Sequence, residues 1–230
     1  MMVHGEAPPI WRQYRRLVKG EQILVAADTA PGNGDDCTAQ FLSKTHKDFP
    51  LVYQSSDGTI NMTNRLHPVL ESIFDQTGVQ PIVTYEGNNG GEYELKRLDG
   101  LNRLGKFVVY RWPIFSTNAK GERKITSYRD NWITTEPSRK QMLMDLQDLL
   151  NKLAFGIYDE WTIEQLHSFV VLNGKPQASA KAHDDLVMAL AIVIQLYLYA
   201  DVKPEAAASP SQASVQQALS ELPPLDIGYN

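Results

Sequence analysis

The chain has 230 residues, of which 43% are hydrophobic and 21% charged, with a formal net charge of −5 and a single cysteine, Cys37. This composition predicts a globular chain that buries its own core, and one cysteine excludes an intramolecular disulfide and a cysteine-based zinc site. The N-terminus lacks the apolar segment of a secretory signal, and the longest apolar run, residues 186–200, is shorter than the roughly 20 residues of a membrane span. We therefore expect no membrane segment.

The first half of the chain predicts four strands and two helices. Residues 10–20 are basic and indicate a short helix or a linker. Helices are expected over 64–77 and 93–101 from the spacing of apolar residues, and Gly78 is suited to end the first. Short apolar segments are typical of strands, and four of them are expected over residues 23–27, 37–43, 50–54 and 82–85. The turn PGNGDD joins the first two strands into a hairpin.

The second half of the chain continues this alternation. Residues 107–110 predict a strand, and residues 112–132 a two-stranded basic hairpin around a turn at 118–121. A strand over 169–172 precedes a long apolar helix over about 183–200. An amphipathic helix is expected over 140–155, with an apolar stripe made of Met142, Leu146, Leu149, Leu150 and Leu153.

The order of these elements predicts an α/β fold with a mixed sheet. From Lys203 onward the sequence is of low complexity, as in a linker or tail. We divide the chain into a basic N-terminal linker, one folded domain and a C-terminal tail, over residues 1–21, 22–202 and 203–230.

Four carboxylates lie at the ends of apolar segments. Asp28 follows the strand 23–27, Glu86 follows the strand 82–85, and Asp184 and Asp185 open the last helix. Taken singly, each has an ordinary explanation as a turn residue, a strand end or a helix cap. Taken together, they are placed to converge on divalent cations, because Mg²⁺ and Mn²⁺ prefer oxygen ligands.

Two such cations about 4 Å apart can hydrolyse a phosphodiester, since they activate a water and stabilise the charge of the transition state and leaving group. We expect Asp28, on the central strand, to bridge the two ions and Glu86 to hold one of them. Either Asp184 or Asp185 would hold the other, and the sequence does not distinguish between them. His183 is expected to support a ligand rather than to bind metal itself.

Basic residues cluster apart from these acids. The predicted hairpin interleaves them with aromatic residues, and two more begin the helix that follows. We expect these cations to contact the DNA backbone, although the net charge of −5 fits equally well with ordinary solvated surfaces. The proposed DNA-binding residues are Lys120, Arg123, Lys124, Arg129, Arg139 and Lys140.

The chain resembles the C-terminal nuclease domain of phage terminase large subunits, the DNA-packaging motor protein. The matching segments are VAADTAPGNGDDCTAQ, IVTYEGNNGG and KAHDDLVMALAIVI, which carry Asp28, Glu86 and the pair Asp184–Asp185 at the three catalytic positions. The resemblance implies a ribonuclease H-like mixed sheet flanked by helices, with the hairpin as an excursion. It also implies two Mg²⁺ or Mn²⁺ ions and endonucleolytic cutting of concatemeric double-stranded viral DNA.

The same resemblance implies partners and a location. These are the packaging ATPase domain, the small terminase subunit and the portal protein, in the cytoplasm of an infected bacterial host. Residues 100–106 fit G-x-x-x-x-G-K, but Phe107 replaces the Ser or Thr of a P-loop, so we predict a nuclease domain without an ATPase. Two alternatives stay open: a nuclease like Holliday-junction resolvases, and a catalytically silent docking module.

Overall fold

A mixed sheet of six strands forms the centre of the protein, in the order β1-β4-β3-β2-β5-β6. The computed structural model describes residues 10–31, 34–117, 122–172, 175–178 and 183–199. The first four strands in the sheet are antiparallel neighbours, whereas β5 and β6 run parallel to β2. The strands are β1 (Trp11–Gln13), β2 (Ile23–Asp28), β3 (Cys37–Ser43), β4 (Asp48–Ser55), β5 (Ile82–Tyr85) and β6 (Val108–Val109).

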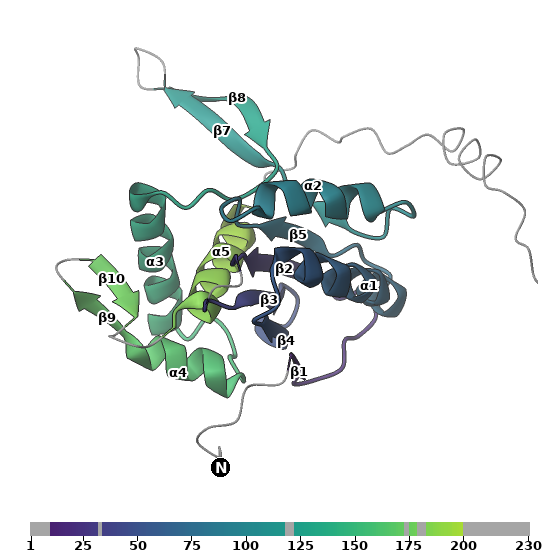
Figure 1. The fold of residues 1–230 in the computed structure, drawn as a ribbon, viewed down its shortest axis with the longest axis horizontal. Coiled ribbons are helices and arrows are strands. Elements are labelled where there is room, and N and C mark those ends of the chain that lie inside the picture. Colours follow the sequence, from purple (N-terminus) through teal and green to yellow (C-terminus); the bar gives the residue numbers. More distant parts are fainter. Residues whose placement is uncertain (1–9, 32–33, 118–121, 173–174, 179–182, 200–230) are drawn as a thin grey trace, which may run out of the picture.

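Helices cover both faces of this sheet and create two separate cores (Figure 1). On one face lie α1 (Thr59–Thr77) and α2 (Gly91–Leu101), and on the other lie α3 (Glu136–Asn151) and α5 (Asp185–Tyr199). Side chains of a strand alternate between the faces. In β2, therefore, Ile23, Val25 and Ala27 pack against α1 and α2, while Leu24 and Ala26 pack against α5.

The predicted α/β class with a mixed sheet and flanking helices is confirmed, and the four early strands lie where they were expected. The interpretation of residues 10–20 as a helix or linker is wrong in part, because Trp11–Gln13 form the edge strand β1 and Trp11 pairs with Tyr53. Arg12 is buried in this strand and forms an ion pair with Asp159. The sequence did not indicate this burial, because the partner of Arg12 is 147 positions away.

The helices differ from prediction mainly at their ends. Helix α1 begins at Thr59 instead of residue 64, and Gly78 ends it in the left-handed conformation, as predicted. Helix α3 begins at Glu136 because Thr135 and Ser138 form a capping box, and it ends at Asn151. Leu153 consequently leaves the apolar stripe and is exposed. Helix α4 (Glu160–Ser168), capped by the side chain of Asp159, was not predicted.

Two short hairpins extend the sheet-and-helix body. The predicted basic hairpin is confirmed as β7 (Trp112–Thr117) and β8 (Arg123–Arg129), which pair in antiparallel fashion and project from the body in Figure 1. A second hairpin joins β9 (Phe169–Leu172) to β10 (Lys175–Ala178), of which only the first strand was predicted. None of the helices in the described ranges has the length and hydropathy needed to cross a membrane.

Candidate metal centre

The alternation of side chains along two neighbouring strands brings Asp28 and Glu86 to the same place. In β2, Asp28 continues the series of Leu24 and Ala26, which faces α5. The parallel strand β5 pairs Ala27 with Tyr85, and the Glu86 amide donates to the carbonyl of Ala27 at 2.8 Å. Both carboxylates therefore lie at the carboxyl ends of adjacent strands, on the side of the sheet that α5 covers.

The carboxyl groups of Asp28 and Glu86 interact directly. Asp28 and Glu86 are hydrogen-bonded through their side chains, and Glu86 is only 6% exposed. Burial, the hydrogen bond to Glu86 and the negative charge of Glu86 raise the pKa of Asp28 well above its ordinary value. The amide of Asn88 donates to Glu86 Oε1 at 3.0 Å. Two adjacent carboxyl groups that are largely shielded from solvent and repel each other when ionised are suited to bind a cation between them.

Helix α5 presents Asp185 to this pair. Asp185 is 7% exposed; its Oδ2 accepts from the Asp36 amide at 3.3 Å, and its carbonyl accepts from the Thr38 hydroxyl at 2.8 Å. Both contacts come from the start of β3, beside β2. Burial, with the negative charges of Asp35 and Asp184, raises the pKa of Asp185 to about 6. The negative charges of Asp185 and Asp184 also raise the pKa of Asp28.

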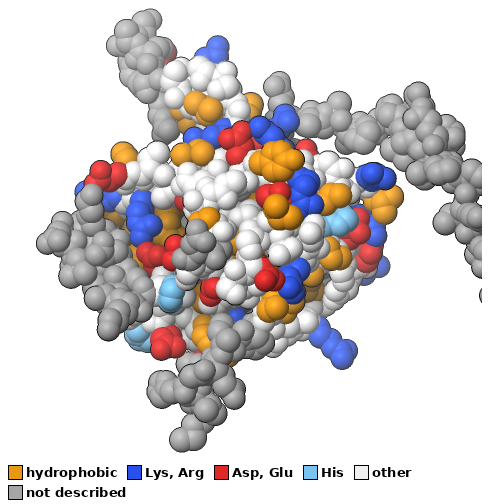
Figure 2. Space-filling view, viewed as in Figure 1, with side chains coloured by type: hydrophobic (Ala, Val, Ile, Leu, Met, Phe, Trp, Pro, Cys, Tyr) orange, Lys and Arg blue, Asp and Glu red, His pale blue; other side chains and the backbone are white. Residues whose placement is uncertain are grey.

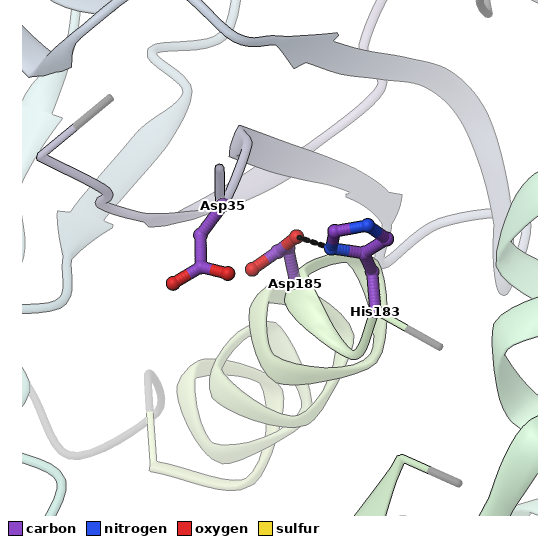
Figure 3. A group of neighbouring side chains, drawn as sticks. All are labelled: Asp35, His183 and Asp185. Carbon is purple, nitrogen blue, oxygen red and sulfur yellow. Dashed lines mark ion pairs between the residues drawn. The ribbon is translucent and has the colours of Figure 1, made fainter. Parts of the chain in front are cut away.

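A second group of possible ligands surrounds Asp185. Asp35, His183 and Asp185 each offer a ligand atom, and these atoms lie within 4.8 Å of one another. Figure 3 shows the three side chains turned toward one another above the first turn of α5. His183 Nδ1 lies 3.7 Å from Asp185 Oδ2. His183 and Asp35 therefore both lie beside Asp185, and the supporting role expected of His183 stays a prediction.

Asp184 points elsewhere. Its Oδ2 forms an ion pair with Nη2 of Arg139 at 2.7 Å, and its carbonyl accepts from the Met188 amide as the first helical hydrogen bond of α5. Of the two consecutive acids, Asp185 therefore belongs to the buried cluster, and Asp184 caps the helix and pairs with Arg139. Sequence spacing alone did not separate these roles.

The loop after β5, which follows Glu86, is hydrogen-bonded to the loop after β2. The Thr29 hydroxyl donates to the carbonyl of Asn88 at 2.8 Å, and the side-chain amide of Asn89 donates to the carbonyl of Thr29 at 2.9 Å. The loop then turns into α2 through Gly90, which adopts φ of 84°. At Gly91 the chain passes so close to Glu86 that a Cβ there would lie 1.8 Å from the Glu86 carbonyl oxygen. Thr29 and the asparagines were not singled out from the sequence as site residues.

The described members of the proposed DNA-binding set differ in their exposure and partners. Lys124 and Lys140 are exposed, Arg129 is half-buried, and Arg139 pairs with Asp184. Burial lowers the pKa of Arg129. Lys120 and the side chain of Arg123 lie outside the described part of the chain. Figure 2 shows basic and acidic side chains interspersed on one face of the molecule.

No protein-family model matches the chain, and no curated protein sequence does. Solved structures match its fold. The large terminase nuclease of the thermophilic phage G20c with bound magnesium has a TM-score of 0.55 and 15% identity, covering 83% of this chain and 89% of that one. The Thermus phage P74-26 large terminase nuclease domain has a TM-score of 0.56 and 16% identity, covering 84% and 88%.

A nuclease domain from a human virus has a similar fold as well. The human cytomegalovirus terminase nuclease domain has a TM-score of 0.53 and 11% identity, covering 77% of this chain and 83% of that one. The chain therefore has a ribonuclease H-like α/β fold. Within that class, its fold is the one found in terminase nuclease domains.

The binding of divalent cations is expected to depend on pH through Asp185. A protonated carboxyl cannot act as a ligand, so cation binding must displace a proton below the pKa of about 6. We expect the affinity for Mn²⁺, measured by calorimetry without DNA, to fall by about tenfold per pH unit or more below pH 6, where Asp185 takes up a proton. The same affinity at pH 5 and pH 7 would contradict the assignment of Asp185 as a ligand.

Proposed function

We propose that this protein is the metal-dependent nuclease of a viral genome-packaging terminase, and that it cuts concatemeric double-stranded DNA. The observation that carries the proposal is the convergence of Asp28, Glu86 and Asp185 where the carboxyl ends of β2 and β5 meet the start of α5, with Glu86 and Asp185 buried. The fold supports it, since the similar phage G20c nuclease was solved with bound magnesium, cobalt and zinc.

Asp28, Glu86 and Asp185 would hold two divalent ions, Mg²⁺ or Mn²⁺, with Asp28 shared between them. The donor set fits, because hard cations take carboxylate oxygens and the nearby imidazole of His183 suits Mn²⁺ as well. When bound, the ions lower the pKa of a water and stabilise the charge that develops on the phosphate. The protein's part is to hold the three carboxyl groups oriented and partly shielded from solvent, so that a bound cation offsets the repulsion between them.

Double-stranded DNA is the proposed substrate, reached from the side of the basic hairpin. The proposed partners are the packaging ATPase domain, the small terminase subunit and the portal protein, and the proposed location is the cytoplasm of an infected bacterium. Cleavage assays with Mn²⁺ on a linear duplex and on a four-way junction test the substrate. Preferential cutting of the duplex supports the packaging nuclease, whereas cutting of the junction alone would indicate a resolvase.

The hairpin β7–β8 is expected to supply part of the salt dependence of DNA binding. Replacing Lys120, Arg123 and Lys124 together with alanine should lower the slope of log affinity against log salt by up to about three, because each phosphate contact contributes about 0.9. The control is Lys152→Ala, which removes an exposed lysine at the end of α3. If the triple variant keeps the slope of the control, the hairpin is a solvated excursion and does not bind DNA.

A further inference from the structure

One short segment of the chain, residues 131–139, contacts both elements that carry the proposed ligands. It connects the end of the hairpin β7–β8 to the first turn of α3. At its start it adjoins Glu86, and at its end Arg139 reaches Asp184. We call residues 131–139 the brace.

At the Glu86 end, the brace is held by backbone hydrogen bonds. Trp132 bridges to Glu86 in parallel register: its amide donates to the Tyr85 carbonyl at 2.9 Å, and its carbonyl accepts from the Gly87 amide at 2.7 Å. Asn131 packs over Gly87 so closely that a Cβ on Gly87 would lie 1.6 Å from Asn131 Nδ2. The brace thus continues the sheet past β5 and fixes the position of Glu86.

At the α5 end, the brace holds the helix through one side chain. Arg139 Nη2 lies 2.7 Å from Asp184 Oδ2, and Arg139 Nη1 lies 3.0 Å from Met188 Sδ. Asp184 and Met188 are four residues apart and therefore lie on the same side of the helix start. Consecutive residues of a helix point about 100° apart, so a guanidinium on this side leaves Asp185 directed elsewhere, toward β2 and β3.

We propose that Arg139 is a positioning residue of the metal centre, which holds Asp184 so that Asp185 is presented to Asp28 and Glu86. This inference rests on the proposed function and refines it, because it assigns Asp185 as the ligand and Asp184 as the partner of Arg139. Arg139 was expected from the sequence to contact a DNA phosphate. In the structure its guanidinium is already engaged by Asp184 and Met188.

Binding of Mn²⁺ to the DNA-free protein separates the possible roles of Arg139. If Arg139 only neutralised nearby acids, its removal would leave the site more negative and tighten cation binding. If it only contacted phosphate, its removal would weaken DNA binding and leave Mn²⁺ affinity unchanged. A positioning role alone predicts weaker Mn²⁺ binding without DNA, by the roughly 10- to 100-fold typical when a residue that orients a metal ligand is lost.

The experiment is titration calorimetry of Mn²⁺ with the full chain and its Arg139→Ala, Arg139→Lys and Asp184→Asn variants. We expect about tenfold weaker binding or more in Arg139→Ala, and partial recovery in Arg139→Lys, because lysine restores the charge but not the two-point contact. Asp184→Asn should also weaken binding, and the double variant Arg139→Ala/Asp184→Asn should bind no more weakly than Arg139→Ala, since both changes break one contact. Lys152→Ala, which removes a cation from the end of the same helix, should bind as the wild type does.

Thermal unfolding of the apo proteins shows which variants are folded. If Arg139→Ala does not fold, the Mn²⁺ affinities of Arg139→Lys and Asp184→Asn test the proposal instead. Mn²⁺ affinity in Arg139→Ala equal to that of wild type, or tighter, would overturn the positioning role. A double variant that binds much more weakly than either single variant would overturn it as well, because Asp184 would then be a ligand in its own right. A wild-type protein that binds no Mn²⁺ would instead overturn the proposed function itself.

Discussion

Replacing Asp28 with asparagine is expected to abolish cleavage and yet leave the apo protein as stable as the wild type, or more stable. Asp28 is hydrogen-bonded to Glu86, and burial and repulsion raise its pKa well above the ordinary value. An asparagine there can donate to Glu86 without carrying a charge, so it removes repulsion while it keeps the hydrogen bond. The loss of a shared carboxylate ligand, in contrast, removes the proposed cation site.

The wild-type protein should lose stability as the pH rises, because the pKa of Asp28 is raised in the folded protein. A carboxyl whose pKa is higher in the folded protein than in the unfolded chain favours folding when it is protonated, and this contribution is lost as the pH rises through the folded pKa. In EDTA, the melting temperature of the wild type should therefore decrease as the pH rises through the pKa of Asp28, and Asp28→Asn should lack this part of the decrease.

Thermal unfolding in EDTA at several pH values measures the stability of wild type and Asp28→Asn. Cleavage assays with Mn²⁺ measure their activity. The control is Asp99→Asn, which removes an exposed acid from the end of α2 and should change neither quantity. A melting temperature of Asp28→Asn well below that of wild type at pH 7 would mark Asp28 as a structural residue instead of a ligand.

Replacing Gly91 with alanine is expected to have the second large effect, on both stability and cleavage. The new Cβ would lie 1.8 Å from the carbonyl oxygen of Glu86 and 3.0 Å from Thr29 Cγ2. Backbone atoms must therefore move, and overpacking of this kind costs about 1–3 kcal/mol. Because Glu86 itself is displaced, cleavage should fall by roughly 10²-fold, the effect of a misplacement of about 1 Å at a reacting centre.

The same helix supplies the matched control. Gly100 lies in α2, and a Cβ added there would meet no heavy atom within 4 Å beyond its chain neighbours and the backbone of its own helix. Gly100→Ala should therefore be neutral or stabilise the protein by up to about 1 kcal/mol. Denaturant unfolding and cleavage rates of both variants make the comparison. If Gly91→Ala kept wild-type activity and stability, the close packing of α2 against Glu86 would not matter for the site.

The positions of Asp28 and Glu86 could be predicted because they depend on local features. Short apolar strands end at these residues, and neighbouring parallel strands place their carboxyl ends side by side. The choice between Asp184 and Asp185 could not be predicted, since it depends on the rotation of α5 about its axis. That rotation is fixed by contacts with Arg139, 45 positions away, and with Asp36, 149 positions away.

The errors in the fold have a similar origin. Strand β1 is short and basic, and it exists because it pairs with β4 and because Arg12 finds Asp159. Helix α4 is short as well, and its one local signal is the cap that Asp159 forms with the Thr162 amide at 2.8 Å. Both elements depend on one distant ion pair, which periodicity of hydrophobic residues does not reveal.

Digestion of plasmid DNA with Mn²⁺, Mg²⁺ or EDTA, by wild type beside Asp28→Asn and Glu86→Ala, tests the central claim most directly. We predict cleavage that requires a divalent cation and disappears in both variants while they stay folded. Cleavage that survives both substitutions would contradict the site. A folded wild-type protein that cuts DNA with neither cation would contradict the nuclease and favour a docking module.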